Sequence, residues 1–134
     1  MKALSIRAPW WWFILHGGKD IENRDWRTHY RGPVLVHASK WWAATRVSYD
    51  AFEMRHTTTA KPTPSAWSEI RAAGGCIVGQ VEIVDCVAES ASPWFVGRHG
   101  FVLRNPVAFA TPIPCTGALG FFNVPADVME RVKP

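Results

Sequence analysis

The chain has 134 residues, of which 48% are hydrophobic and 19% are charged. That length suits one domain covering residues 1–134, whose hydrophobic core needs neither a metal nor a disulfide. The composition excludes a disordered chain, and no apolar run approaches the roughly 20 residues that span a bilayer. The charged Lys2 and Arg7 also argue against a secretory signal. We therefore expect a cytoplasmic domain with no membrane segment.

The formal net charge of +4 permits an anionic partner such as RNA or a nucleotide, but it does not demand one. The basic residues are not gathered into a lysine-rich tract. Between Lys19 and Arg31, four basic residues stand beside three acidic ones. A binding surface for a polyanion would therefore have to be assembled by folding.

The cysteines and histidines show no spacing typical of metal ligands. Cys76, Cys86 and Cys115 are odd in number and contain no CxxC pair, which favours buried free thiols in a reducing compartment. The chain also lacks a P-loop and a dinucleotide-binding fingerprint. We expect neither a metal nor a cofactor.

The first part of the chain predicts short strands around one helix. Pro9 suits a helix start because its missing N–H costs nothing in the first turn, and Gly17 and Gly18 supply a left-handed end. In chain order we expect a strand at 3–7, a helix at 10–16, a loop or the start of a strand at 19–24, a turn at 30–33 and a buried strand at 34–38.

Beyond residue 38, Ser39 suits an N-cap, and apolar residues recur after it at helical spacing. The expected elements are helices at 39–55, 65–73 and 125–132, a loop at 57–64, and strands at 76–87, 100–104, 107–110 and 117–124. About six or seven short strands with helices inserted early predict an α+β fold. We expect a small closed β-barrel with the helices packed around it.

One segment fills a known pattern. Gly17, Lys19, Glu22 and Arg24 occupy the four fixed places of G-x-K-x-x-E-x-R. With this segment the chain resembles the ASCH domain, named after the ASC-1 homology region, in the PUA-like barrel superfamily. Further blocks in matching order lie at 4–10, 30–33, 37–39, 78–79, 84–86, 112–115 and 117–120. The resemblance runs nearly end to end and implies a PUA-like barrel.

The resemblance also implies a cleft lined by the signature segment and suited to RNA or a cytidine-like nucleoside. Some small ASCH proteins are amidohydrolases that act on N4-acetylcytidine with a lysine, a threonine and a glutamate. Lys19 matches that lysine, whereas Glu22 stands at the threonine place. Other members look like RNA-binding or RNA-cleaving proteins. Phe101 is a further departure, since many relatives have tryptophan there.

Lys19 and Glu22 are the candidate catalytic residues. A desolvated lysine can act as a base or nucleophile, and a charged one can hold a phosphate or an oxyanion. The alternative is a solvated lysine paired with Glu22 or Asp20. Glu22 can serve as a general base or bind the amino edge of a base. Its alternative is an ion pair with Arg24, because positions 22 and 24 of a strand share a face.

The candidate binding residues combine cations with aromatic rings. Arg24 suits bidentate contact with phosphate, and Arg7 is expected across the cleft from Lys19, although ordinary surface charge also explains Arg7. Trp10 and Trp26 bracket the signature and are nominated for base stacking, with core packing as the alternative. Two further candidates stand at the expected helix N-terminus, where anions bind: Ser39 and Lys40.

Three functions follow as hypotheses. The first is a binding module for RNA or a cytidine-like nucleoside. The second is a metal-independent hydrolase acting on an acylated cytidine or on single-stranded RNA. The third is a protein-interaction module that uses exposed tryptophans, of which the chain has eight. The sequence leaves the oligomeric state open.

Overall fold

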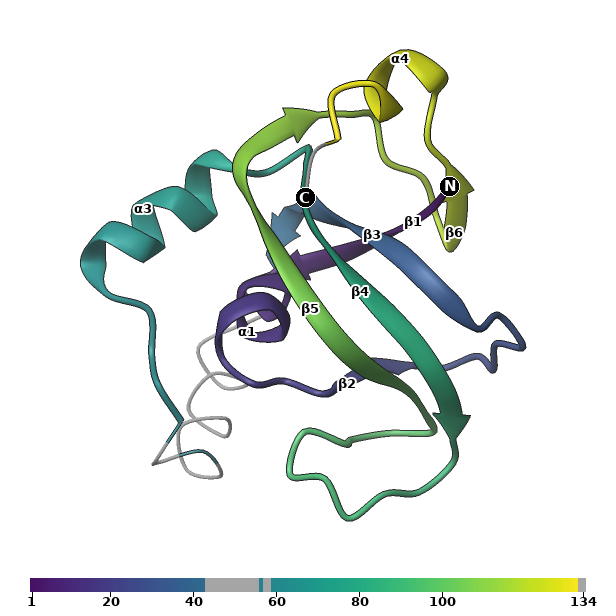
Figure 1. The fold of residues 1–134 in the computed structure, drawn as a ribbon. Helices are drawn as coiled ribbons and strands as arrows, with labels where there is room; N and C mark the ends of the chain where they lie inside the picture. Colours follow the sequence, from purple (N-terminus) through teal and green to yellow (C-terminus); the bar gives the residue numbers. More distant parts are fainter. Residues whose placement is uncertain (43–55, 57–58, 133–134) are drawn as a thin grey trace.

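The computed structural model describes residues 1–42, 56 and 59–132, and it has an α+β architecture (Figure 1). Its strands form one mixed sheet in the order β2-β5-β4-β3-β1-β6, in which only β1 and β3 are parallel neighbours. The strands are β1 (Lys2–Ala8), β2 (Ile21–Arg24), β3 (Gly32–Trp42), β4 (Cys76–Val87), β5 (His99–Pro114) and β6 (Phe121–Asn123). The helices are α1 (Trp10–His16), α3 (Pro64–Ala72) and α4 (Ala126–Met129).

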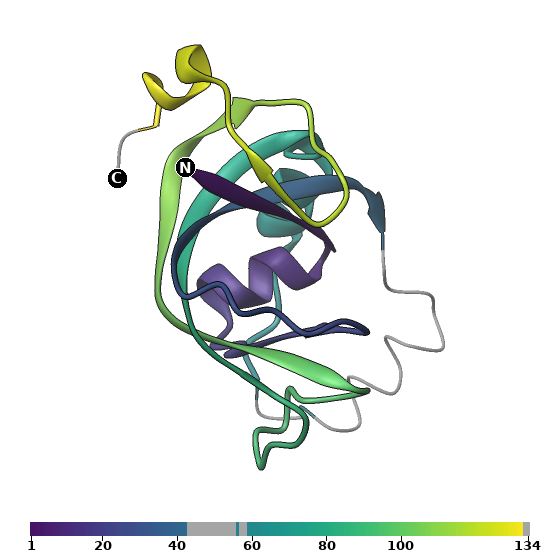
Figure 2. The same cartoon turned by 90° about the vertical axis from the view of Figure 1, so that its right-hand side faces the viewer.

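Helix α1 lies in the hollow of the curved sheet (Figure 2). It contacts β1, β3, β4 and β5. Trp11, Ile14 and Leu15 of this helix belong to the main buried cluster. Each buried side chain of this size contributes about 1.5–3 kcal/mol, so the packing fixes α1 firmly against the sheet. Within the described residues, no helix has the length and apolarity needed to cross a bilayer.

The two glycines after α1 end the helix as the sequence predicts. The N–H groups of Gly17 and Lys19 both donate to the Phe13 carbonyl, at 2.9 and 3.0 Å. A side chain at Gly17 would approach Phe13 Cδ1 to 2.6 Å, and Gly18 has a φ of +76°. Neither position suits another residue well. The turn therefore delivers Lys19 directly beneath α1 and leads the chain into β2.

The expected helix at 39–55 does not begin at Ser39. Strand β3 continues to Trp42, because it pairs with β1 as far as Ala8 and with β4 at Cys76. These ladders satisfy the backbone groups that a helix would have used, and tryptophan is also a good strand former. Residues 43–55 of the expected helix lie outside the described residues.

The later elements also differ in extent from the predictions. The two strands expected at 100–104 and 107–110 form the single strand β5. Asn105, with a φ of 55°, and Pro106 are absorbed as a bulge, since Gln80 pairs with Val107 and Glu82 with Arg104. Both C-terminal elements, β6 and α4, are shorter than expected.

The expected closed barrel is not confirmed, because strand pairing among the described residues ends at β2 on one side and at β6 on the other. Side chains approach one another across this gap. Trp26 and Tyr30 pack on Phe121 with ring centroids 5.6 and 5.5 Å apart. Arg24 of β2 donates to the Ser5 carbonyl of β1 at 2.7 Å. Aromatic packing and one arginine thus connect β2 with the β1–β6 side of the sheet.

Gly79 lies where the surrounding atoms leave no room for a side chain. A Cβ there would lie 2.5 Å from the Val107 carbonyl oxygen and 2.8 Å from Leu15, so backbone would have to shift. We expect Gly79→Ala to lower the free energy of unfolding by ~1–3 kcal/mol in urea denaturation. Gly74→Ala is the matched control, since its Cβ would meet no atom closer than 3.4 Å. Equal losses for the two variants would contradict the prediction.

Candidate functional site

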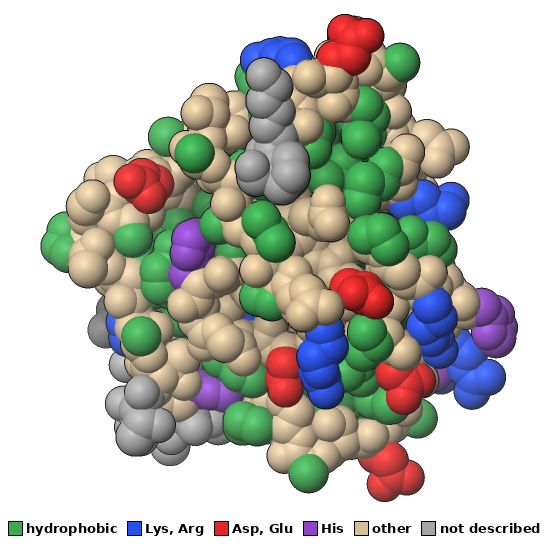
Figure 3. Space-filling model, in the orientation of Figure 1, with side chains coloured by type: hydrophobic (Ala, Val, Ile, Leu, Met, Phe, Trp, Pro, Cys, Tyr) green, Lys and Arg blue, Asp and Glu red, His purple; other side chains and the backbone are tan. Residues whose placement is uncertain are grey.

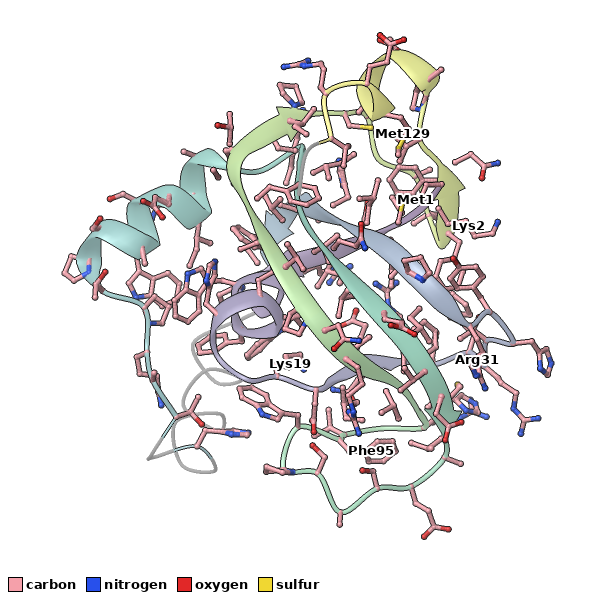
Figure 4. All side chains as sticks on the ribbon, in the orientation of Figure 1. Met1, Lys2, Lys19, Arg31, Phe95 and Met129 are labelled. Atoms are coloured by element: carbon pink, nitrogen blue, oxygen red, sulfur yellow. The ribbon has the colours of Figure 1, made fainter. Side chains whose placement is uncertain are left out.

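Lys19 lies between the end of α1 and the start of β2, beside the connection from β4 to β5 (Figure 4). It is only 6% exposed, which is unusual for a lysine. Its Nζ lies 5.6 Å from the ring centroid of Trp10 and 5.2 Å from that of Trp94. Among the described residues, no hydrogen bond or ion pair reaches this ammonium. Lys19 is thus not a solvated, ion-paired lysine.

The environment of Lys19 disfavours its charged form. Burial lowers the pKa of Lys19, and the nearby carboxylates of Glu22 and Asp20 oppose this shift only in part. The two indole faces also favour a cation, although more weakly than water would. The result is an amine that gives up its proton more easily than an exposed lysine does.

Glu22 and Arg24 form the ion pair that their positions on one face of a strand permit. Arg24 Nε donates to Glu22 Oε2 at 2.9 Å, and the same guanidinium donates to the Ser5 carbonyl. The side chains are 9% exposed for Glu22 and 19% for Arg24. Arg24 therefore holds Glu22 against β1. The second carboxylate oxygen of Glu22 has no hydrogen-bond partner among the described residues.

Two residues that the sequence did not single out complete the surroundings of Lys19. Trp94, in the connection between β4 and β5, is 8% exposed and places its ring over the ammonium. The buried His56 stacks on Trp94 with ring centroids 4.0 Å apart. Both residues lie far from the signature segment in the chain, so no local spacing could have indicated them.

His37 is a buried histidine whose two ring nitrogens both have hydrogen-bond partners. Its Nε2–H donates to the Cys115 carbonyl at 2.7 Å, so Nδ1 accepts the hydroxyl proton of Ser5 at 2.8 Å. Burial lowers the pKa of His37. The histidine thereby links β3 to β1 and to the segment after β5.

The remaining candidates are more dispersed. Arg7 is exposed near the end of β1, and Trp26 is half-buried against Phe101 and Phe121. Ser39 and Lys40 belong to β3, so the helix N-terminus on which their nomination depended is not at that position. Trp10, Lys19 and Glu22 are therefore the candidates that the structure brings together, with Arg24 bound to Glu22.

A cavity of about 180 Å³ adjoins the backbone around Lys19. Its lining includes Asp20, Leu103 and Asn105 but neither Glu22 nor Arg24. The lysine, the glutamate and the arginine therefore do not converge on this cavity. On the face shown in Figure 3, Lys and Arg side chains are interspersed with Asp and Glu. Among the residues that the structure describes, no group of three or more His, Cys, Asp or Glu side chains is placed to hold a metal ion.

Comparison with known proteins gives one consistent result. The family model of the ASCH domain matches residues 4–100. Human activating signal cointegrator 1 is 26% identical over 160 residues, and its mouse counterpart is 24% identical over 155. Each alignment covers 98% of this chain but only 23% of the relative. The chain thus spans less than a quarter of the length of these relatives.

Proposed function

Because the chain belongs to the ASCH domain family, we propose that it binds RNA or a cytidine-like nucleoside at Lys19 and acts in RNA or modified-nucleoside metabolism. The observation that carries this proposal is the buried Lys19 side chain, whose ammonium faces Trp10 and Trp94 with no acceptor among the described residues. Burying an unpaired cation costs on the order of several kcal/mol. Such a cost is typical of a group that a ligand uses.

The proposed domain extends over residues 1–134. The family match ends at residue 100. Beyond it, β5 continues its ladder with β4, and β6 pairs with β1. The residues after position 100 therefore supply strands to the same sheet, which supports one ASCH domain rather than a domain with an appended tail.

The binding proposal assigns a role to each group near Lys19. The ammonium attracts a phosphate or a polarised carbonyl, and Trp10 offers an aromatic ring whose centroid lies 5.6 Å from it. The free oxygen of Glu22 can accept a hydrogen bond from an exocyclic amine such as that of cytosine. Arg24 holds Glu22 in place and contributes positive charge. Arg7 is the exposed cation nominated to meet the backbone of a longer RNA.

Binding is tested by fluorescence anisotropy with a labelled single-stranded RNA. We expect a Kd of roughly 1–100 µM that weakens as salt rises from about 50 to 200 mM. Lys19→Met should reduce the affinity at least about tenfold, whereas the control Lys2→Met should change it by less than about twofold. Equal affinities for both variants and the parent protein would refute a binding role for Lys19.

A metal-independent hydrolase is the second candidate, favoured by the lowered pKa of Lys19 beside a carboxylate. A neutral amine can act as base or nucleophile toward an acyl group, with Glu22 receiving a proton. N4-acetylcytidine and single-stranded RNA are the substrates to incubate, with mass spectrometry of the products. Turnover that survives a chelator and is lost in Lys19→Met would favour this candidate. Unchanged substrate alongside RNA binding would favour the binding module.

A protein-interaction module is the third candidate, in keeping with the name cointegrator carried by the curated relatives. The expected exposed tryptophans give it little support, because every tryptophan with a described side chain is buried or half-buried. Leu119, which is 99% exposed, is the side chain that favours it most. Equal RNA affinity for Lys19→Ala, Arg24→Ala and the parent protein would favour this candidate.

A further inference from the structure

We propose that Asn23 and Asp20 are positioning residues, which latch the segment 88–98 beside Lys19 so that the Trp94 ring is held over its ammonium. We call this segment, the connection between β4 and β5, the cover segment. This inference rests on the proposed function, since it explains how that site is closed. In Figure 4, the label of Phe95, which belongs to the cover segment, lies below that of Lys19.

Three hydrogen bonds form the latch. Ser92 Oγ donates to Asp20 Oδ1 at 2.6 Å. Asn23 Nδ2 donates to the Trp94 carbonyl at 2.9 Å, and its Oδ1 accepts the Val96 N–H at 2.9 Å. Asn23 thus uses both ends of its amide on one loop, which an alanine or a serine could not do. The bonds flank Trp94 on either side and fix the backbone that carries its ring.

The latch residues fill variable places of the signature pattern. Asp20 follows Lys19, and Asn23 lies between Glu22 and Arg24 on β2. Successive strand residues face opposite ways, so Asn23 points away from the ion pair. One face of β2 therefore braces the site through Arg24, and the other face holds the cover segment.

The cover segment is longer than its connection requires. Antiparallel strands such as β4 and β5 can be joined by two to five residues, and longer connections are usually functional. Most residues of the segment are exposed, whereas Trp94 is 8% exposed and contacts Phe13 at a centroid distance of 5.8 Å. The segment thus places one large, buried side chain beside the Lys19 ammonium.

Closure of the cover segment accounts for the desolvation of Lys19. Within the described part of the chain, the charged groups around the ammonium are Glu22 of β2 and Asp20 before it, and the titratable His56 stacks on Trp94. Opening the cover segment leaves the two carboxylates in place but admits water. The pKa of Lys19 should then rise toward its ordinary value, because hydration stabilises the ammonium.

The test follows Lys19 by NMR titration of its ¹³Cε and ¹⁵Nζ signals in the lysine-labelled 134-residue chain. Asn23→Ala and Ser92→Ala each break part of the latch without changing the charge near Lys19. We expect both to raise the Lys19 midpoint, with the larger shift for Asn23→Ala, which loses two bonds. Asn23→Asp is unsuitable, because it keeps only the bond to Val96 and adds a charge near Lys19. Ser68→Ala, a hydroxyl deletion on α3, is the control and should leave the midpoint unchanged.

The outcomes separate this inference from the proposed function. An unchanged midpoint in folded Asn23→Ala or Ser92→Ala overturns the positioning role, whatever the RNA assay shows. If Asn23→Ala does not fold, the milder Ser92→Ala decides alone. Raised midpoints in a protein that binds no RNA or nucleoside would support the positioning role while refuting the function proposed for the site.

Discussion

Replacing Lys19 with methionine is expected to abolish ligand binding and turnover while making the folded domain more stable. Methionine has a similar length and fills the space under Trp10 and Trp94 without a buried charge. Replacing a residue that is retained for function at the expense of stability typically raises the free energy of unfolding by ~0.5–2 kcal/mol. Urea denaturation near neutral pH, run beside the RNA and nucleoside assays, measures both effects.

The stability difference should depend on pH in a defined direction. The pKa of Lys19 is lower in the folded state than in the unfolded state. Between these two pKa values the unfolded chain binds more protons, so the stability of the parent protein gains from rising pH. Below the folded value the full cost of the buried charge applies. The advantage of Lys19→Met should therefore be largest below the pKa that Lys19 has in the folded state, and it should shrink as the pH rises toward the ordinary lysine pKa.

Controls separate this result from a general effect of removing charge. Lys2→Met deletes a lysine charge elsewhere, on β1, and should change the free energy of unfolding by less than about 0.5 kcal/mol. If Lys19→Met is less stable than the parent protein, or if its stability difference does not vary with pH, the ammonium is not the strained group inferred here.

Arg24→Met is expected to have the largest destabilising effect of the substitutions considered. It leaves the buried Glu22 carboxylate without its partner and removes the donor to the Ser5 carbonyl. Breaking one side of a buried ion pair costs about 3–5 kcal/mol, and the partial exposure of this pair places it near 3 kcal/mol. Chemical denaturation of the two proteins under identical conditions gives the value.

The double variant Glu22→Gln with Arg24→Met shows where that cost originates. Removing both charges abolishes the uncompensated carboxylate, so the double variant should be more stable than Arg24→Met alone. The free energy of unfolding of Arg24→Lys should lie between those of Arg24→Met and the double variant, because one ammonium cannot reach both acceptors with the geometry of a guanidinium. Additive effects in the double variant would show that the pair is not coupled.

Local signals in the sequence predicted a large part of the fold. The bounds of α1 and β4 agree with the expected 10–16 and 76–87, because Gly17 and Gly18 mark the end of α1 and Gly74 and Gly75 directly precede β4. The signature segment predicted both the family and the shared face of Glu22 and Arg24. These features depend on residues that are neighbours in the chain, where spacing carries physical information.

Features set by distant partners could not be predicted in this way. Strand β3 extends through Ser39 because β1 and β4 supply partners for its backbone, which outweighs the helical spacing that follows. Trp94 reaches Lys19 through hydrogen bonds from Asn23, a contact 71 residues apart in the chain. The spacing of residues along one sequence does not indicate such contacts between distant segments.

The short strand β2 constrains how this domain can vary in length. Its alternate residues face opposite ways, so a single residue inserted between Glu22 and Asn23 would place Glu22 and Arg24 on opposite faces of the strand. The ion pair between them would then be lost. Insertions should be accepted instead within the exposed part of residues 88–91, where an added residue leaves the orientation of β2 unchanged.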